Sequence, residues 1–295
     1  MLLCRATPLD GLNLWALGGT GLVAGILGSA LGVGGGFLMV PILTLALGLP
    51  IKVAIASSLV AIVANSCTAA GIYTKARLTN IRLGLLLETV TIPGAIIGGF
   101  IAAVIAPSIL SAIFGLALIY AAYTMLTPKQ LMYEDNSSAN GSMARNIATD
   151  NLSASLANSY YDQNLDKIVT YKVNRTPAGL VAGFFSGILS SLLGIGGGVV
   201  NVPVTHLIMG VPIKAAIATS TFIITITTAA GALIYHFHGH IYPFIIAPLV
   251  IGIIIGARIG VELTQRAGGI LLRRIFGVFL IIIAILMFLK TANVI

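Results

Sequence analysis

Long apolar runs alternate with short polar connectors along most of the chain, and the alternation occurs twice in the same order. The apolar segments cover residues 11–31, 36–49, 50–74, 83–106 and 108–126, and then 177–194, 198–211, 213–235, 243–264 and 270–289. A helix needs about 20 residues to cross the roughly 30 Å hydrocarbon core of a bilayer, and several of these runs are that long. The pattern predicts two repeats of five helical segments each.

The two repeats share a phrase of sequence. Residues 31–41 read LGVGGGFLMVP and residues 193–203 read LGIGGGVVNVP, at an offset of 162 residues. Over residues 31–58 and the second copy, 16 of 28 positions are identical. Self-similarity of this kind indicates a duplicated unit.

Three consecutive glycines interrupt each copy. Each glycine lowers helix propensity by about 1 kcal/mol relative to alanine, so the helix is expected to break there. The 14 residues that follow, 36–49, would form about 21 Å of helix, which is shorter than the bilayer core. We therefore expect a hairpin of two short or broken helices that meet at the glycines.

Composition assigns the chain to the membrane. It is 58% hydrophobic and 8% charged, with a mean hydropathy of +1.05, whereas soluble domains carry about 25% charged residues. The net charge of +8 is spread over short connectors, which suits topology-setting charges and argues against nucleic-acid binding. Cys4 and Cys67 show no disulfide or metal spacing. The spacing of two among His236, His238 and His240 is a weak metal signal, so we expect no metal and no cofactor.

Residues 127–176 differ from the rest of the chain. They are rich in Asn, Ser, Asp and Tyr and contain five acidic and five basic residues, a composition that suits a solvated or disordered linker. The chain therefore divides into a first transmembrane repeat (11–126), a polar linker (127–176) and a second transmembrane repeat (177–290). Four Asn-x-Ser/Thr sequons in the linker matter only if it is translocated.

Lys and Arg are distributed oppositely in matching connectors. The connector after residue 74 carries Lys75, Arg77 and Arg82, whereas its copy, 236–240, carries none. The next connector reverses the bias, with none at 106–108 and Arg266, Arg273 and Arg274 in the copy. By the positive-inside rule, matching loops lie on opposite sides of the membrane. We expect an all-α polytopic protein of the cell membrane with inverted-topology repeats, about 8–10 transmembrane segments, a cytoplasmic linker and both termini outside.

The duplicated motif, Gly-x-Gly-Gly-Gly followed by Val-Pro and by Gly-x-Pro-x-Lys, resembles the TauE/SafE sulfite exporter family, also called the toluene sulfonate uptake permease family. The resemblance covers essentially the whole chain except the linker. It implies secondary transport of small anions such as sulfite or organosulfonates, without identifying the substrate. An anion channel and a non-transporting membrane scaffold are the alternatives. No HExxH, P-loop or GxSxG motif is present, so we do not expect an enzyme.

The candidate anion site lies at the two breaks, because helix N-termini carry partial positive charge and bind anions. Its candidate residues are the break glycines, nearby hydroxyl and amide side chains, and one lysine per repeat: Gly34, Gly35, Gly36, Gly196, Gly197, Gly198, Ser57, Ser58, Thr219, Ser220, Asn65, Asn201, Lys52 and Lys214. The alternatives are that the glycines only permit close packing, that the hydroxyls only join helices, and that the lysines extend to the headgroups.

Glu88 is the only acid well inside the spans of the first repeat. Ionisable groups inside a membrane are functional by default, so Glu88 is the candidate for proton coupling. The expected partners are a small anion, the bilayer and a coupling proton, and the sequence leaves room for a homo-oligomer.

Overall fold

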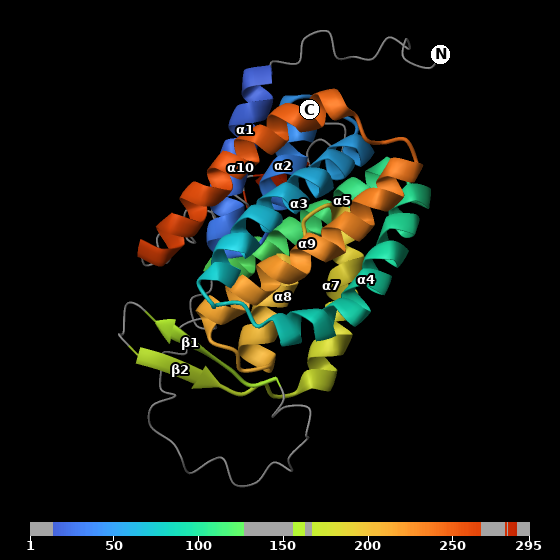
Figure 1. The fold of residues 1–295 in the computed structure, drawn as a ribbon. Helices are drawn as coiled ribbons and strands as arrows, with labels where there is room; N and C mark the ends of the chain where they lie inside the picture. Colours follow the sequence, from blue (N-terminus) through green and yellow to red (C-terminus); the bar gives the residue numbers. More distant parts are fainter. Residues whose placement is uncertain (1–13, 127–155, 163–166, 267–280, 282, 288–295) are drawn as a thin grey trace.

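The structure, a computed structural model, describes residues 14–126, 156–162, 167–266, 281 and 283–287. Within these ranges six helices are long and apolar enough to cross a membrane. These six are α1 (Leu14–Leu31), α3 (Ile51–Lys75), α4 (Ile81–Val104), α7 (Thr176–Leu193), α9 (Ile213–Phe237) and α10 (Pro243–Arg266) (Figure 1). A further apolar helix, α5 (Pro107–Leu126), is not among the six. The prediction of an all-α polytopic membrane protein is confirmed.

The short helices follow the glycines as expected. The first is α2 (Gly36–Pro41), which continues into the π-helical turn η1 (Ile42–Ala46), and the second is α8 (Gly198–Pro203), which continues into η4 (Val204–Ile208). Their N-caps, Gly35 and Gly197, have φ angles of 87° and 70°, which side chains other than glycine rarely adopt. Each glycine triplet thus supplies, at the start of a short helix, the residue that adopts this backbone conformation without strain.

The first helix of each repeat packs along the fourth helix of the other, α1 along α10 and α4 along α7. Glycines allow these pairs to touch backbone to backbone: Gly25 faces the carbonyl of Ile253, and Gly187 faces that of Thr91. Each residue in the second contact lies 162 positions from its counterpart in the first. Such reciprocal contacts are what a two-fold relation between the repeats produces.

The matched helices α3 and α9 begin at opposite ends of the molecule. Lys52 Nζ, at the start of α3, donates to Ala103 O near the end of α4 at 2.8 Å. At the other end of α4, the backbone N–H of Asn80 donates to Thr219 Oγ1, near the start of α9, at 3.0 Å. Antiparallel matched helices fit the inverted arrangement, although the sides of the membrane stay a prediction.

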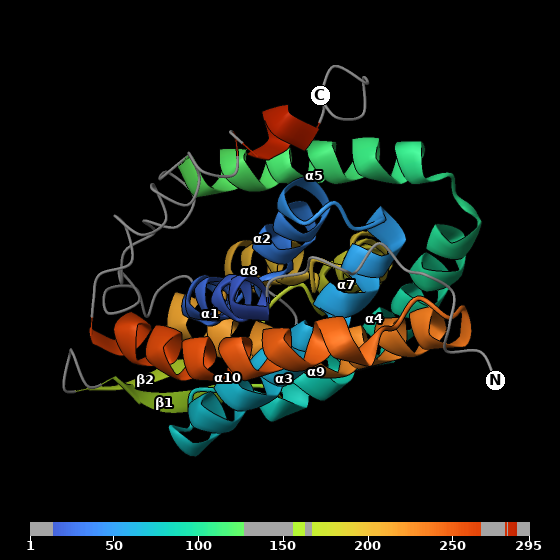
Figure 2. The same cartoon turned by 90° about the horizontal axis from the view of Figure 1, so that it is seen from above.

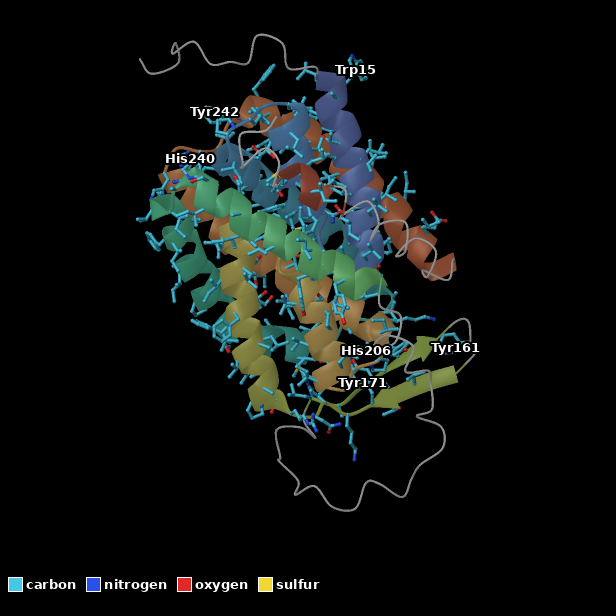
Figure 3. All side chains as sticks on the ribbon, turned by 180° about the vertical axis from the view of Figure 1, so that it is seen from behind. Trp15, Tyr161, Tyr171, His206, His240 and Tyr242 are labelled. Carbon is cyan, nitrogen blue, oxygen red and sulfur yellow. The ribbon has the colours of Figure 1, made fainter. Side chains whose placement is uncertain are left out.

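The short helices lie inside the molecule. Figure 2 shows α2 and α8 between α5 on one side and α10, α3 and α9 on the other. The outer surface is apolar, with Val104 88% exposed, as a lipid-facing surface requires. Figure 3 shows Trp15, Tyr242 and His240 toward one end and Tyr171 and Tyr161 toward the other, an arrangement that suits aromatic residues at two membrane interfaces.

Part of the linker is ordered, which its composition did not predict. Strands β1 (Asn158–Asp162) and β2 (Lys167–Tyr171) form an antiparallel hairpin with Asn158 opposite Tyr171. Leu156, Tyr160 and Tyr171 are buried in a cluster with residues of α4 and the loop after η4. This apolar contact explains why the hairpin is ordered, because its side chains pack against the membrane domain. Three predicted parts lie wholly or largely outside the described residues: 11–13, most of the linker, and the segment at 270–289.

Candidate functional site

The two glycine breaks contact each other at the centre of the molecule. A Cβ on Gly36 would overlap the carbonyl oxygen of Gly194, and a Cβ on Gly198 would overlap that of Gly32. The six predicted glycines, 34–36 and 196–198, are all buried. Folding therefore brings together two motifs that are 162 residues apart in the chain.

The first N–H groups of both short helices make no hydrogen bond within their helix. The N–H groups of Leu38 and Met39 donate to Gly35 O, and those of Val200 and Asn201 donate to Gly197 O. Within the described part of the chain, the N–H groups of residues 35–37 and 197–199 donate no hydrogen bond. Buried N–H groups without an acceptor are costly, and at a helix start they carry partial positive charge. The junction of the breaks therefore favours an anion.

Two isoleucines close this junction. A Cβ on Gly34 would lie 2.9 Å from Ile62 Cγ2 and 3.4 Å from Ile224 Cγ2. The matching distances from Gly196 are 3.3 Å and 3.2 Å. Since each isoleucine contacts both breaks, the structure shows a closed arrangement, and an anion would enter only after these side chains move.

The predicted hydroxyls link the repeats instead of facing the N–H groups. Ser58 Oγ donates to Gly194 O at 2.8 Å, and Ser220 Oγ donates to Gly32 O at 3.4 Å. Thr219 Oγ1 accepts from the Asn80 N–H. Ser57 Oγ is buried without a hydrogen-bond partner in the structure. Ser57 is thus the one of these four whose hydroxyl is unused.

The predicted amides lie at the breaks. Asn65 Nδ2 donates to Gly34 O at 3.2 Å, whereas its Oδ1 has no partner. Asn201 is buried on α8, one turn after Gly197. Both predicted amides therefore lie close to a glycine break.

The predicted lysines lie at helix starts. Lys52 is half-buried, and its bond to Ala103 O places its charge beside the C-terminal end of α4, where a cation is stabilised. Along the axis of α3, Lys52 lies about 9 Å from Ser58, which is six residues further on. Lys214 is half-buried at the matching place on α9. This contact of Lys52 with a helix end was not among the predicted alternatives, which were an anion and the lipid headgroups.

The second break has polar neighbours that the first lacks, which the sequence reasoning missed. Ser186 Oγ donates to Gly197 O at 3.0 Å. Ser190 Oγ is buried without a partner, and Ser190 Cβ lies 3.2 Å from the position that a Cβ on Gly197 would take. The residues at the matching places of the first repeat are Ala24 and Gly28. A position-by-position comparison of the repeats would have revealed this difference.

Glu88 is buried, with 3% of its surface exposed, between α4 and α9. Thr91 Oγ1 donates to Glu88 Oε2 at 3.0 Å, and Thr227 Oγ1 lies 3.2 Å from the same oxygen. Thr91 was not among the predicted residues, because a lone threonine in an apolar run gives no signal. The carboxyl group thus lies inside the membrane domain, as its sequence position predicted.

The histidine connector lies at one end of the molecule, where Figure 3 labels His240. Burial lowers the pKa of His240 below its usual value, and the charges of Lys52 and His238 lower it further. His238 Nδ1 lies 2.8 Å from Ile234 O. Among the described residues no group of three His, Cys, Asp or Glu side chains could hold a metal ion.

Duplicated, glycine-broken short helices enclosed by long apolar helices define a class of protein, the polytopic membrane transporters. The sequence pattern of one family, described as sulfite exporter TauE/SafE, matches residues 17–287, and the chain belongs to that family.

Two relatives carry similar names. A protein of Bacillus subtilis (strain 168) named as a probable membrane transporter is 27% identical over 253 residues, which cover 83% of this chain and 86% of that protein. A protein of Methanocaldococcus jannaschii, also named as a probable membrane transporter, is 28% identical over 261 residues, which cover 83% of this chain and 84% of that protein. No solved structure gives a significant match to the chain.

Proposed function

We propose that this family member is a secondary transporter of small anions, with sulfite and organosulfonates as the leading substrates. The family name supports the sulfur oxyanion class. The observation that carries the proposal is the meeting of two buried helix starts whose N–H groups, at residues 35–37 and 197–199, find no acceptor among the described residues. An anion that leaves water needs fixed donors, because an uncompensated ion in hydrocarbon costs many kcal/mol.

The proposed site comprises the N–H groups of both breaks, with the unused hydroxyl of Ser190 beside Gly197. Ser57 on α3 carries a second buried hydroxyl without a partner. Asn65 and Asn201 flank it from α3 and α8. The closed junction supports alternating access, since Ile62 and Ile224 must part before the site meets water on either side. The antiparallel relation of α3 and α9 supports inverted repeats around this site.

Binding tests the proposal directly. Purified protein in detergent would be titrated calorimetrically with sulfite, thiosulfate, sulfoacetate and taurine, with chloride as the reference anion. Gly197→Ala should weaken binding at least tenfold, because its Cβ strains a positive-φ cap and approaches Ser186 Oγ. Gly71→Ala is the matched control, since a Cβ at Gly71 meets nothing within 4 Å.

Ser190→Ala provides a milder variant that preserves the fold. It removes one unpartnered hydroxyl and should weaken binding about three- to tenfold, in line with one hydrogen bond. Size exclusion would check the folding of each variant. Wild-type affinity in well-folded Gly197→Ala and Ser190→Ala proteins would show that the breaks are packing devices and not the binding site.

Flux distinguishes a transporter from a channel. Protein in liposomes that carries out saturable counterflow of a bound sulfonate would support the transporter. A large electrical conductance for the same anion would support the channel, and binding without flux would support a scaffold.

A further inference from the structure

The buried carboxyl group of Glu88 has no role in the anion site as described, yet its position inside the membrane domain indicates a function. Glu88 lies on the second turn of α4, inside the membrane domain and 3% exposed. A charged side chain in this position is expensive, and side chains of this kind mark ion or proton pathways in membrane proteins.

The environment of Glu88 consists of hydroxyls. Thr91 Oγ1 and Thr227 Oγ1 approach its carboxyl oxygens at 3.0 Å and 3.2 Å, and the two hydroxyl oxygens lie 3.1 Å apart. Helix α7 packs against the same part of α4, where Gly183 lies beside Thr91 and Leu87. These helices, α4, α7 and α9, bring no charged or titratable side chain to the carboxyl group within the described residues. The group has hydrogen-bond partners but no counter-charge.

The cluster lies beside the second break. Ile224, one turn before Thr227 on α9, contacts Gly196 and Gly198 of the second break and also reaches Gly34 of the first. In the first repeat the residue at the place of Thr227 is Asn65, which binds Gly34 O. The residue that matches Glu88 in the second repeat is Val250, so the ionisable group belongs to one break alone.

We propose that Glu88 is the proton-binding group of the transporter and that a proton on Glu88 is carried together with the anion bound at the second break. This inference rests on the anion transport proposed above. A carboxylate at Glu88 repels an anion at Gly196–Gly198, and this repulsion is strong where water is excluded. Protonation removes it: the carboxylate takes up one proton to become the neutral acid, and the proton leaves on the side where the anion leaves. By linkage the proton and the anion each raise the affinity for the other.

The sign of the coupling follows. Anion affinity should rise as the pH falls, by up to tenfold per pH unit where one proton is linked. Glu88→Gln mimics the neutral acid, so its anion affinity should stay at the high value at all pH values. Glu262→Gln is the matched control, because Glu262 is exposed in the last two turns of α10.

The experiment uses the full chain and sulfoacetate, whose own charge is constant from about pH 6 to pH 8. Calorimetric titration across this range should give a pH-dependent affinity for the wild type and for Glu262→Gln, and a constant one for Glu88→Gln. In liposomes an inward proton gradient should drive sulfoacetate accumulation by the wild type. Glu88→Gln should lose this accumulation entirely, while its counterflow exchange falls by less than threefold.

Two results would overturn the proposal: unchanged pH dependence in well-folded Glu88→Gln, or accumulation that follows a sodium gradient instead of a proton gradient. If no anion binds at all, the anion transport proposal fails first. The proton site is then tested alone by infrared titration, in which wild type and Glu262→Gln should show a titrating carboxyl band that Glu88→Gln lacks. Identical spectra in all three proteins would overturn the assignment of the proton to Glu88.

Discussion

At the scale of single residues, the pH response of the histidine connector can be predicted with its sign. The pKa of His240 in the folded protein lies below the usual value of 6.5, because of burial and of the nearby Lys52 and His238 charges. The unfolded chain therefore binds this proton more readily, and the stability that neutral His240 provides is complete above pH 6.5 and is lost as the pH falls through the lowered pKa.

The measurement is the thermal unfolding midpoint in detergent from about pH 8 to pH 5. His240→Gln should show a smaller drop at acidic pH than the wild type. His236→Gln, exposed one turn earlier, is the control and should follow the wild type. An equal acidic drop in His240→Gln and wild type would assign the sensitivity to another group.

Predictions for single residues succeeded where the cause lies in neighbouring residues of the sequence. They failed where it lies in contacts between residues far apart in the chain. The helix break before Gly36 and before Gly198 was predicted from the triplet itself, and the structure adds that the N-caps Gly35 and Gly197 have positive φ. That Ser58 would donate to Gly194 O, a residue 136 positions away, depends on how the repeats interlock, and no local pattern encodes it. Ser190 was overlooked because a serine near a helix end usually bonds its own backbone, and only its replacement of Gly28 in the aligned repeats sets it apart.

At the scale of elements, Asn80 connects three parts of the molecule. Its Oδ1 accepts from the Leu83 N–H and caps α4, its Nδ2 donates to Leu156 O in front of the hairpin at 2.9 Å, and its N–H donates to Thr219 Oγ1. Asn80→Ala removes the first two bonds. We expect a loss of about 1–2 kcal/mol in stability, mostly from the cap, together with release of the hairpin.

Limited proteolysis of liposome-embedded protein would detect that release as faster cleavage within residues 156–174. The matched control is Asn158→Ala, because Asn158 Oδ1 accepts from a local, exposed N–H, that of Ser159. Equal cleavage rates for Asn80→Ala and the wild type would mean that the apolar contacts of Tyr160 and Tyr171 hold the hairpin alone.

Element boundaries were predictable because apolar runs and Gly/Pro punctuation mark them. Helices α3 and α9 begin directly after Pro50 and Pro212, which are their N-caps. The hairpin at 158–171 was not predictable from composition, because its order comes from contact with Leu83 and Met209 and not from its own sequence.

At the scale of the whole molecule, the contacts and the charges agree on which segments share an end. Leu156, in front of the hairpin, contacts the start of α4 through Asn80, so the hairpin and the basic connector with Lys75, Arg77 and Arg82 lie at one end. His240 lies beside Lys52 at the start of α3, which is the other end. The positive-inside rule then assigns the linker end to the cytoplasm and the histidine end to the outside.

Cysteine labelling in intact cells tests this orientation. Asn80 is too buried to react, whereas Arg77 and Gly239 are both exposed in matching connectors. In a background with Cys4 and Cys67 replaced by Ser, a membrane-impermeant maleimide should label Gly239→Cys in intact cells. It should label Arg77→Cys only after the membrane is opened, because the positive-inside rule predicts that this connector faces the cytoplasm. Labelling of both positions from the same side would contradict the inverted repeats, since antiparallel α3 and α9 would then not both span the bilayer.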